Sequence, residues 1–416
     1  MSIEVTMRHS DVRIESLKEY AQTRMEKLAQ KFPKVTKVTI VIDVDVKKHM
    51  YMAEVVANRL GETAVGAKEF SESGKSVIDA AAARAERQLL KMRVKARNAR
   101  IKYYGKTVSV YAPLYIGNTC VNSCRYCDFR AAHTGTVRRN LTMDEIRLEA
   151  GAVKATGIDS LLIVAGEAPH VNSVEHFCEV GVMLKKMFSN LSLEVAPQSE
   201  EAYRAMFEAG YESLTCFQET YDPERYKYFH PQGPKSNYEW RLWTQLRAGK
   251  AGFRTLGCAF LLGLCPWRPE AASLGAHAFY LMKECYESKI QFAFPRFCRV
   301  EGGFVPPHEV SEEDVDLMML AFRIVFPQCG MTVSTREAPR FRDYIVQVAA
   351  DSMSAGSRVT PGGYAVLEKE HAKDVAQFAL TDRRPPAEVY AAIRANGQEV
   401  VYKNWDNRIQ GRGLGS

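Results

Sequence analysis

Three cysteines stand close together in the segment YIGNTCVNSCRYCDFR, at positions 120, 124 and 127. Thiolates are soft ligands that bind zinc or iron. Structural zinc takes four ligands, usually as two pairs, and no second pair accompanies Cys120, Cys124 and Cys127. Three thiolates on one loop can hold three irons of a 4Fe-4S cluster and leave the fourth iron open to another ligand. The spacing C-x3-C-x2-C therefore favours an iron-sulfur centre with one open position.

Polar residues also follow other apolar segments that have the length of buried strands. Eight such segments come after Gly105, at 107–116, 160–166, 192–197, 213–220, 255–264, 290–297, 331–337 and 351–358. Helical stretches separate them, so the pattern predicts an α/β fold in which a parallel sheet closes into a (β/α)8 TIM-type barrel. The polar residues at the ends of these segments are Glu167, Gln198, Glu219, Arg296, Arg336 and the serines of 352–357. Because chemistry in such barrels sits at the carboxyl ends of the strands, we expect these side chains to face one mouth together with the cysteines.

The composition is that of an ordinary folded protein from a reducing compartment. The chain has 416 residues, of which 46% are apolar and 25% charged. No apolar run of about 18 residues appears, and the first residues do not resemble a signal peptide, so we expect a cytoplasmic protein with no membrane segment. Ten cysteines are too sparse for a disulfide scaffold, and the seven outside the triplet are scattered as buried small residues usually are.

The first quarter of the chain carries all of the excess positive charge. Residues 1–105 contain 21 Lys and Arg against 13 Asp and Glu, and the remainder contains 35 against 36. The segment 84–102 holds eight of these basic residues, namely Arg84, Arg87, Lys91, Arg93, Lys95, Arg97, Arg100 and Lys102. One interpretation is a solvated helix end, where cations are favoured. The other is a surface for phosphate backbones, which binds in a salt-dependent way.

The periodicity of this quarter predicts a separate small domain over residues 1–102. An amphipathic helix over 12–32 follows a first strand, and alternating apolar residues over 35–46 begin a run of three strands. A long helix begins at about Lys75. The order β-α-β-β-β-α describes a small α+β domain with a helix-covered sheet. We expect the barrel to occupy 103–405 and a flexible tail to occupy 406–416.

The cysteine segment resembles the radical S-adenosylmethionine (SAM) enzymes, whose motif is C-x3-C-x-aromatic-C. The resemblance implies a 4Fe-4S cluster on Cys120, Cys124 and Cys127, with SAM bound at the open iron. It places Tyr126 near the adenine, and it places Gly166 and Glu167 of "AGEAP" at the methionine amino group of SAM. A carboxylate is a suitable acceptor for an ammonium group. Gln198 and Glu219 are the further residues expected to contact this cofactor.

Residues 103–405 are similar, in collinear order, to the 2-iminoacetate synthase family. The similarity is carried by "LLIVAGEAP", "FQETYDPERYKYFHPQGPKSNYEWR", "STREAPRFRD" and "SMSAGSRVTPGGY". It implies a carbon–carbon lyase that cleaves L-tyrosine to 2-iminoacetate and p-cresol for thiamine biosynthesis. Arg336 is then the expected donor to the substrate carboxylate, with Tyr115 and either Ser352 or Ser354 as helpers. The alternative for Arg336 is a structural salt bridge with Glu337 or another neighbour.

The block that follows "QETY" also matches the family, but the sequence assigns no role to its polar residues. These residues are His230, Lys235, Tyr238 and Arg241. A tryptophan-cleaving relative of the same barrel remains an alternative. The maturase that converts tyrosine to carbon monoxide and cyanide is not expected, because it has a further cysteine cluster and the last cysteine here is Cys329.

Residues 1–100 resemble ribosome hibernation promoting factors, on the strength of the opening "IEVTMRHSDVRIESLKEYAQTRMEKLAQKF", the "VTIVIDV" hairpin and the "SVIDAAAARAERQLLKMRVKARN" helix. That resemblance implies contact with RNA of the small ribosomal subunit through 84–102. A translation-silencing protein with a non-catalytic barrel is therefore the competing hypothesis.

The lyase hypothesis implies three other partners: L-tyrosine, a reductant such as flavodoxin or ferredoxin, and a thiazole synthase.

Overall fold

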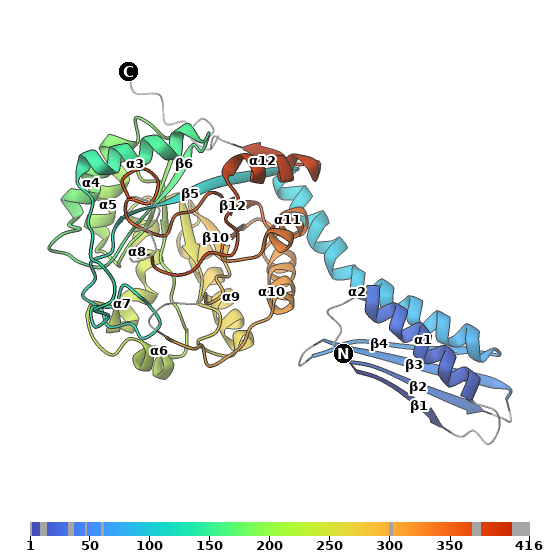
Figure 1. The fold of residues 1–416 in the computed structure, drawn as a ribbon. Coiled ribbons are helices and arrows are strands. Elements are labelled where there is room, and N and C mark those ends of the chain that lie inside the picture. The colour runs from blue at the N-terminus through green and yellow to red at the C-terminus, as the bar shows by residue number, and fades with distance from the viewer. Residues whose placement is uncertain are drawn as a thin grey trace. The chain divides into compact units, whose positions relative to one another are not determined.

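The computed structural model describes residues 2–8, 15–31, 37–45, 48–59, 62–298, 303–367 and 376–401. The chain divides into two compact units, 1–96 and 97–416, and each is described by itself (Figure 1). The division falls within a helix, six residues before the boundary expected from the sequence. The tail expected at 406–416 lies outside the described residues. Within the described residues no helix is both long and apolar enough to cross a membrane.

The first unit has the predicted order of elements. They are β1 (Ser2–Arg8), α1 (Glu15–Lys31), β2 (Lys37–Asp45), β3 (Met50–Arg59), β4 (Glu62–Ser71) and α2 (Gly74–Tyr104), whose last residues belong to the second unit. The sheet has the order β1-β2-β3-β4; β1 and β2 are parallel, and the other neighbours are antiparallel.

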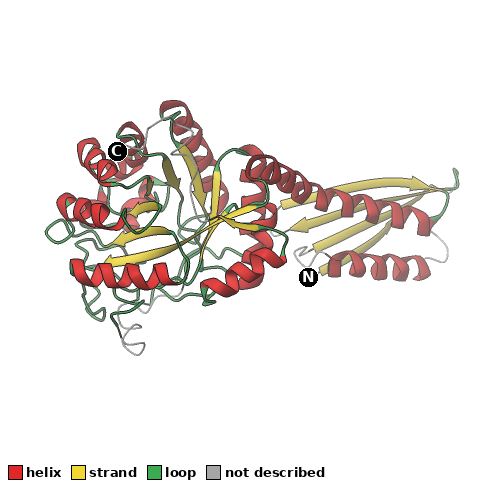
Figure 2. Ribbon diagram, turned by 90° about the horizontal axis from the view of Figure 1, so that it is seen from above, coloured by secondary structure: helices red, strands yellow, loops and turns green. Residues whose placement is uncertain are grey.

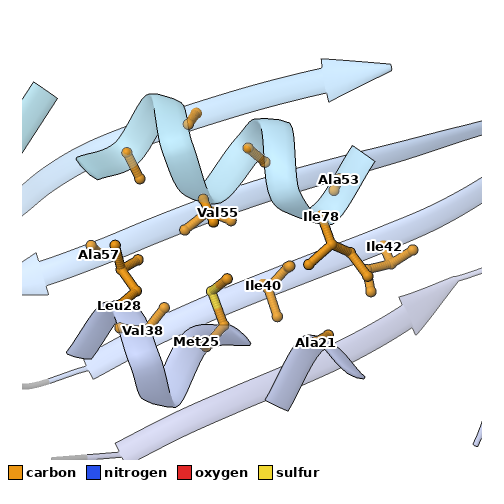
Figure 3. Packing of buried hydrophobic residues seen from close by; sticks show 14 of the residues in the cluster. Ala21, Met25, Leu28, Val38, Ile40, Ile42, Ala53, Val55, Ala57 and Ile78 are labelled. Atoms are coloured by element: carbon orange, nitrogen blue, oxygen red, sulfur yellow. The ribbon is translucent and has the colours of Figure 1, made fainter. Parts of the chain in front are cut away.

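Alternating apolar residues make one face of this sheet suitable for packing against helices. In β2 the side chains of Val38, Ile40 and Ile42 are buried, and their neighbours in sequence are more exposed. Met25 of α1 and Ile78 of α2 are also fully buried and belong to the same cluster (Figure 3). The helix-covered sheet predicted from the periodicity is therefore confirmed.

The second unit is a closed barrel of eight parallel strands, as the sequence predicted (Figure 2). The strands are β5 (Thr107–Gly117), β6 (Ser160–Ala165), β7 (Asn190–Glu194), β8 (Ser213–Thr215), β9 (Thr255–Cys258), β10 (Lys289–Ala293), β11 (Gly330–Val333) and β12 (Ser352–Ser354). Each pairs with its neighbour in chain order, and Ser354 of β12 pairs with Tyr111 of β5 to close the ring.

At least one helix follows every strand and covers the barrel from outside (Figure 1). In chain order these are α3 (Met143–Ala155), α4 (Val174–Leu184), α5 (Glu200–Ala209), α6 (Pro223–Phe229), η1 (Pro234–Ser236), α7 (Tyr238–Leu242), α8 (Thr244–Lys250), α9 (Trp267–Glu284), α10 (Glu312–Val325), α11 (Pro339–Val348) and α12 (Pro386–Ala395). A ninth strand, β13 (Glu399–Val401), pairs in parallel with the start of β5. The sequence analysis did not predict β13, which has only three residues, none of them buried.

The interior of the barrel is hollow because its strands point small polar side chains inward. Bulky branched residues usually fill such a barrel. Here the inward positions include Ser109, Ser160, Ser192, Ser213 and Thr255, and a cavity of about 600 Å³ remains. The barrel therefore leaves room for a ligand below the strand ends.

One residue of the basic segment 84–102 is not a surface cation. Arg100 is 1% exposed, and its guanidinium donates to the carbonyl oxygens of Gly105, Thr107 and Ala350. It therefore joins the end of α2 to the amino-terminal side of the barrel. The expectation that all eight basic residues are available to RNA is wrong for Arg100, because charge count alone does not show which side chains are buried.

Candidate functional site

The cysteine loop lies between β5 and α3, and backbone hydrogen bonds hold it against the segment that follows α6. Ser123 N donates to Gln232 O at 3.2 Å, and Arg125 N donates to Phe229 O at 3.0 Å. Cys124 lies between these two contacts and is 5% exposed. All ten cysteines are free thiols. The fold therefore fixes the loop while leaving Cys120, Cys124 and Cys127 available as ligands.

The surroundings of the three thiols fit an iron-sulfur cluster. Burial raises the pKa of Cys124 to about 12, so the thiolate form needs a bound cation to compensate it. Asn122 Nδ2 donates to Cys120 Sγ at 3.7 Å, and Gln377 Nε2 donates to Cys127 Sγ at 3.9 Å. Hydrogen bonds of this kind to the cysteine sulfurs are typical of iron-sulfur clusters and help to set the reduction potential of the cluster. Among the described residues, no three His, Cys, Asp or Glu side chains converge on a position for a single metal ion. A 4Fe-4S cluster does not need three side chains that converge on one point, because each cysteine binds a different iron of the cube.

Glu167 and Gly166, at the end of β6, lie against the cysteine loop. Asn122 Nδ2 donates to Glu167 Oε2 at 2.5 Å, and Val121 N donates to Glu167 O at 2.8 Å. A Cβ added to Gly166 would lie 2.3 Å from the carbonyl oxygen of Thr119, so only glycine fits this close approach. The arrangement brings the carboxylate of Glu167 beside the loop, where an ammonium group of SAM is expected to bind. That role of Glu167 remains a prediction.

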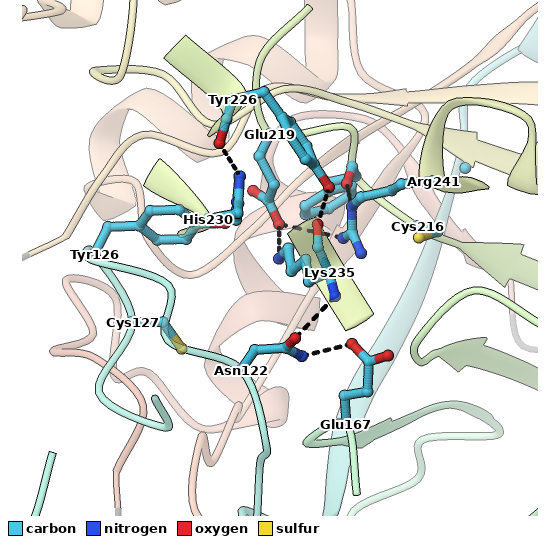
Figure 4. A network of polar contacts seen from close by, with 12 residues as sticks. Asn122, Tyr126, Cys127, Glu167, Cys216, Glu219, Tyr226, His230, Lys235 and Arg241 are labelled. Atoms are coloured by element: carbon cyan, nitrogen blue, oxygen red, sulfur yellow. Dashed lines mark hydrogen bonds and ion pairs between the residues drawn. The ribbon is translucent and has the colours of Figure 1, made fainter. Parts of the chain in front are cut away.

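Glu219 lies just beyond β8 and forms the centre of a buried ionic network (Figure 4). Lys235 Nζ lies 2.7 Å and Arg241 Nη2 lies 3.3 Å from its Oε1. Burial acts to raise the pKa of Glu219, but the two cations outweigh it and lower the pKa to about 2. The backbone of Glu219 has a φ of 71°, which is rare for a residue other than glycine. Strained backbone and paired charges both indicate a position that the fold holds for function.

The same network reaches the cysteine loop. Lys235 N donates to Asn122 Oδ1 at 2.8 Å, so Asn122 joins Lys235 to Glu167 (Figure 4). The structure thereby gives Lys235 and Arg241 the role that the sequence could not assign, which is to position Glu219 and the loop. Tyr238 has a packing role, because its hydroxyl donates to Tyr221 O at 2.9 Å and its ring lies 5.1 Å from the ring of Tyr226.

Tyr126 is held in a single orientation by His230. The hydroxyl of Tyr126 lies 2.8 Å from His230 Nε2, and His230 Nδ1 lies 2.8 Å from the carbonyl oxygen of Tyr226. Since a carbonyl can only accept, Nδ1 carries the proton and Nε2 accepts from Tyr126. Burial and the charge of Lys235 lower the pKa of His230 to about 3, so the imidazole is neutral. This contact fixes the ring that the resemblance places near adenine.

Gln198 lies apart from the other predicted residues. It sits in the loop between β7 and α5, and its Nε2 donates to Ala196 O at 3.2 Å. Its backbone carbonyl accepts from Arg247 Nε at 2.8 Å. Gln198 does not line the barrel cavity. The structure therefore shows a local packing contact for Gln198, and cofactor binding by this residue remains a prediction.

Arg336 lies beyond the end of β11 and lines the cavity. Its guanidinium stacks 3.5 Å from the ring centroid of Phe378 and donates to Arg296 O at 3.3 Å. The neighbouring Glu337 is paired instead with Arg296, whose Nε lies 2.8 Å from Glu337 Oε1. Within the part of the chain that the structure describes, Arg336 has no carboxylate partner. The salt-bridge alternative for Arg336 therefore lacks its proposed partner, and the guanidinium is free to bind an anion.

The three predicted helpers of Arg336 all line the same cavity. Tyr115 donates to Gln377 Oε1 at 2.7 Å, and Gln377 also contacts Cys127, as described above. Ser354 Oγ accepts from Thr335 N at 3.1 Å, whereas Ser352 lies two residues earlier on the same inward face of β12. Ser354 is thus the serine tied to the Arg336 loop.

Three cavity residues or contacts were missed by the sequence analysis. They are Glu194, which lines the cavity, Phe378, on which Arg336 stacks, and Gln377, which accepts from Tyr115. Apart from Ser192, Glu194 is the one polar residue in the apolar segment 192–197. A charged residue within a predicted buried strand was the signal that could have identified it. Gln377 gave no signal, because it lies 262 positions from Tyr115 in the sequence.

A closed parallel barrel with three cysteines beside its strand ends defines a class of enzyme. Residues 114–271 match the Radical SAM superfamily, residues 293–399 match the Biotin and Thiamin Synthesis associated domain, and residues 3–97 match the Sigma 54 modulation protein / S30EA ribosomal protein family. The chain belongs to the radical SAM superfamily, whose members use a 4Fe-4S cluster and SAM. Within it the chain is a relative of 2-iminoacetate synthase, a carbon–carbon lyase.

The similarity to that lyase covers most of both proteins. The 2-iminoacetate synthase of Escherichia coli (strain K12) is 34% identical over 307 residues, which is 74% of this chain and 80% of that protein. The 2-iminoacetate synthase of Salmonella typhimurium is 34% identical over 305 residues, 73% of this chain and 80% of that protein. The X-ray structure of the FeFe-hydrogenase maturase HydG from Carboxydothermus hydrogenoformans is 26% identical, with a TM-score of 0.72, and covers 95% of this chain and 83% of that chain. These findings confirm the predicted fold and both resemblances.

Proposed function

We propose that this chain is a tyrosine lyase that cleaves the Cα–Cβ bond of L-tyrosine to give 2-iminoacetate and p-cresol, for the thiazole of thiamine. The observation that carries the proposal is the 34% identity over 307 residues with the 2-iminoacetate synthase of Escherichia coli. The cavity supports it. Arg336, which has no carboxylate partner among the described residues, lies at the cavity, which Phe217 also lines.

The roles follow from the chemistry of each side chain. When bound, the cluster and SAM supply a 5′-deoxyadenosyl radical by one-electron cleavage of the sulfonium. Glu167 accepts the methionine ammonium of SAM, and Arg336 and Ser354 fix the carboxylate of tyrosine so that its amino group faces the nucleoside. Transfer of an amino hydrogen atom to the nucleoside radical would give 5′-deoxyadenosine, and scission of Cα–Cβ would then give 2-iminoacetate and a 4-hydroxybenzyl radical. One electron and one proton convert that radical to p-cresol, and the external reductant supplies the electron.

A product assay tests this proposal. The full chain is reconstituted anaerobically with iron and sulfide, then incubated with dithionite, SAM and L-tyrosine. We expect 5′-deoxyadenosine and p-cresol to form in step, as measured by liquid chromatography with mass detection. L-Tryptophan in place of tyrosine is the comparison. Formation of deoxyadenosine with tryptophan alone would overturn the tyrosine assignment but not the radical chemistry.

The alternative of a translation-silencing protein with a non-catalytic barrel is disfavoured by the residues around the predicted cluster site. A barrel without activity would not be expected to retain three cysteines, the close approach at Gly166 and the buried charges around Glu219 together. A cytoplasmic location, a flavodoxin or ferredoxin as reductant and a thiazole synthase as acceptor of 2-iminoacetate belong to the same proposal. The imine hydrolyses in water, so direct transfer to the acceptor enzyme would protect it.

The first unit is proposed to bind RNA of the small ribosomal subunit through exposed basic residues of α2. Lys91 and Lys95 are exposed, whereas Arg84 is 2.8 Å from Glu69 and is partly neutralised. We expect the full chain to co-sediment with small subunits at low salt and to be released as salt rises, because phosphate contacts release counterions. Replacing Lys91 and Lys95 together with glutamine should weaken binding by about tenfold or more. Lys283, on α9 of the second unit, provides the control: Lys283→Gln should change nothing. Full binding by the double variant would contradict this interface.

A further inference from the structure

Glu194 is an acidic residue inside the barrel that the protein itself does not pair. It is the last residue of β7, and its side chain lines the cavity. The other acids around the cavity have partners: Glu337 pairs with Arg296, and Asp351 accepts from Arg323 and from Met331 N. Within the described residues, the carboxylate of Glu194 forms no hydrogen bond or ion pair. It therefore presents free acceptor oxygens to whatever occupies the cavity.

A carboxylate without a hydrogen-bond donor in this position lowers the stability of the protein when no ligand is bound. Burial raises the pKa of Glu194 to about 7, an effect that Arg336 opposes and Glu219 reinforces. Removing an ionised group from water without a compensating donor is unfavourable. A ligand that brings a hydrogen-bond donor to these oxygens recovers part of that cost, so the position is better explained by a ligand than by folding.

The location of Glu194 relative to Arg336 defines the shape of that ligand. In the closed ring β7 is the third strand and β11 the seventh, so the two residues project from opposite sides of the barrel. Arg336 follows the end of β11 by three residues, whereas Glu194 is still part of its strand and lies deeper. Phe217, which follows β8 between these two positions in the ring, also lines the cavity. The geometry suits a ligand with an anion at one end, an aromatic ring in the middle and a donor at the far end.

We propose that Glu194 is a specificity-determining residue whose carboxylate accepts a hydrogen bond from the phenol of tyrosine, while Arg336 holds the carboxylate of the same molecule. This inference rests on the proposed tyrosine lyase activity and adds the means by which the cavity selects tyrosine. Phenylalanine, which has the same ring without the hydroxyl, leaves Glu194 unpaired. Sites built to bind a hydroxyl reject such analogues because a buried acceptor loses its donor.

The test compares tyrosine with phenylalanine on the reconstituted, SAM-loaded enzyme. Glu194→Met keeps the side-chain length and removes the acceptor. We expect the Kd for tyrosine, from equilibrium dialysis, to rise about 10- to 100-fold. The Kd for phenylalanine should fall, because in Glu194→Met no acceptor is left without a donor when phenylalanine binds. Glu208→Met, at an exposed position of α5 outside the cavity, makes the same change of residue type and is the matched control; it should leave both constants unchanged.

Each outcome separates the specificity role from other roles. An equal loss of tyrosine and phenylalanine binding would show that Glu194 holds the amino group or the fold, and would overturn the inference. Unchanged tyrosine binding in Glu194→Met would also overturn it while leaving the lyase proposal intact. A wild-type enzyme that forms no p-cresol from tyrosine would remove the proposed function and this inference together.

A second measurement needs no ligand or activity. The groups that influence the titration of Glu194 are Arg336, Glu219, Lys235 and Arg241. Because its pKa in the folded state lies above the usual value of an unfolded glutamate, the folded protein loses stability as pH rises through this range and Glu194 ionises. Glu194→Gln cannot ionise. Its Tm, measured anaerobically by differential scanning fluorimetry, should exceed that of wild type at pH 8, with the difference disappearing near pH 5. A wild type more stable than Glu194→Gln at pH 8 would show that the carboxylate is already paired.

Discussion

Cys124→Ala is expected to abolish SAM cleavage and to leave no intact 4Fe-4S cluster. Cys124 is the middle cysteine of the loop and a predicted cluster ligand, buried between the Ser123–Gln232 and Arg125–Phe229 backbone contacts. Alanine offers no ligand, and the fixed backbone prevents another residue from moving into the position. We expect formation of 5′-deoxyadenosine to fall by more than about 10³-fold, since no partial function remains without the cluster.

The measurement for Cys124→Ala includes iron and sulfide content and the electron paramagnetic resonance spectrum of the reduced protein. Cys178→Ala is the matched control, because Cys178 lies on α4 away from the triplet and is a free thiol. It should retain the cluster and its spectrum. Four irons and a normal spectrum in Cys124→Ala would contradict the assignment of this ligand, and loss of the cluster in Cys178→Ala would show that iron content reports only on folding.

Arg336→Gln is expected to impair tyrosine turnover without affecting the cluster. The guanidinium stacks on Phe378 and has no carboxylate partner among the described residues, so it can form two parallel hydrogen bonds with the substrate carboxylate. Removing one member of a desolvated charge pair costs about 3–4 kcal/mol, which corresponds to about 10²- to 10³-fold in kcat/KM. Arg336→Lys should recover only part of this loss, because an ammonium group cannot form the two parallel hydrogen bonds that a guanidinium forms with a carboxylate.

Two observations would identify the role of Arg336. Uptake of SAM and the spectrum of the cluster should be unchanged in Arg336→Gln, since the proposed role of Arg336 is to bind the substrate carboxylate. Arg340→Gln, at an exposed position of α11 four residues further, should behave as wild type. If Arg336→Gln bound tyrosine normally, a different cation would have to hold the substrate carboxylate.

Much of the fold could be predicted from the sequence because its signals are local. The alternation in β2 and the eight short apolar segments depend only on the periods of strands and helices, and both units have the order that these periods predict. The cysteine motif is equally local, since a spacing of three and two residues already places three thiols on one loop. Glu167 was found because chemistry in a barrel lies at strand ends.

Other features depend on which distant segments meet, and these were decided by the tertiary structure. Arg100 counts as a basic residue in the sequence, but packing against the barrel buries it on three carbonyl oxygens. Gln198 and Glu219 both follow a strand. Glu219 pairs with Lys235 and Arg241, whereas the side chain of Gln198 donates to Ala196 O in its own loop. A strand-end position alone therefore does not show that a side chain reaches the cavity.

The sequence by itself determined the order of elements in the barrel and in the small α+β unit and predicted the three cluster ligands, because each of these signals is local: a strand, a helix or one loop. Only the tertiary structure decided that Glu337 pairs with Arg296, that Gln377 joins Tyr115 to Cys127, and that Glu194 is left unpaired across from Arg336. The physical reason is that closure of the barrel brings together residues separated by tens to hundreds of positions. Their pairing depends on strand register and side-chain direction around the whole ring, which no local pattern specifies.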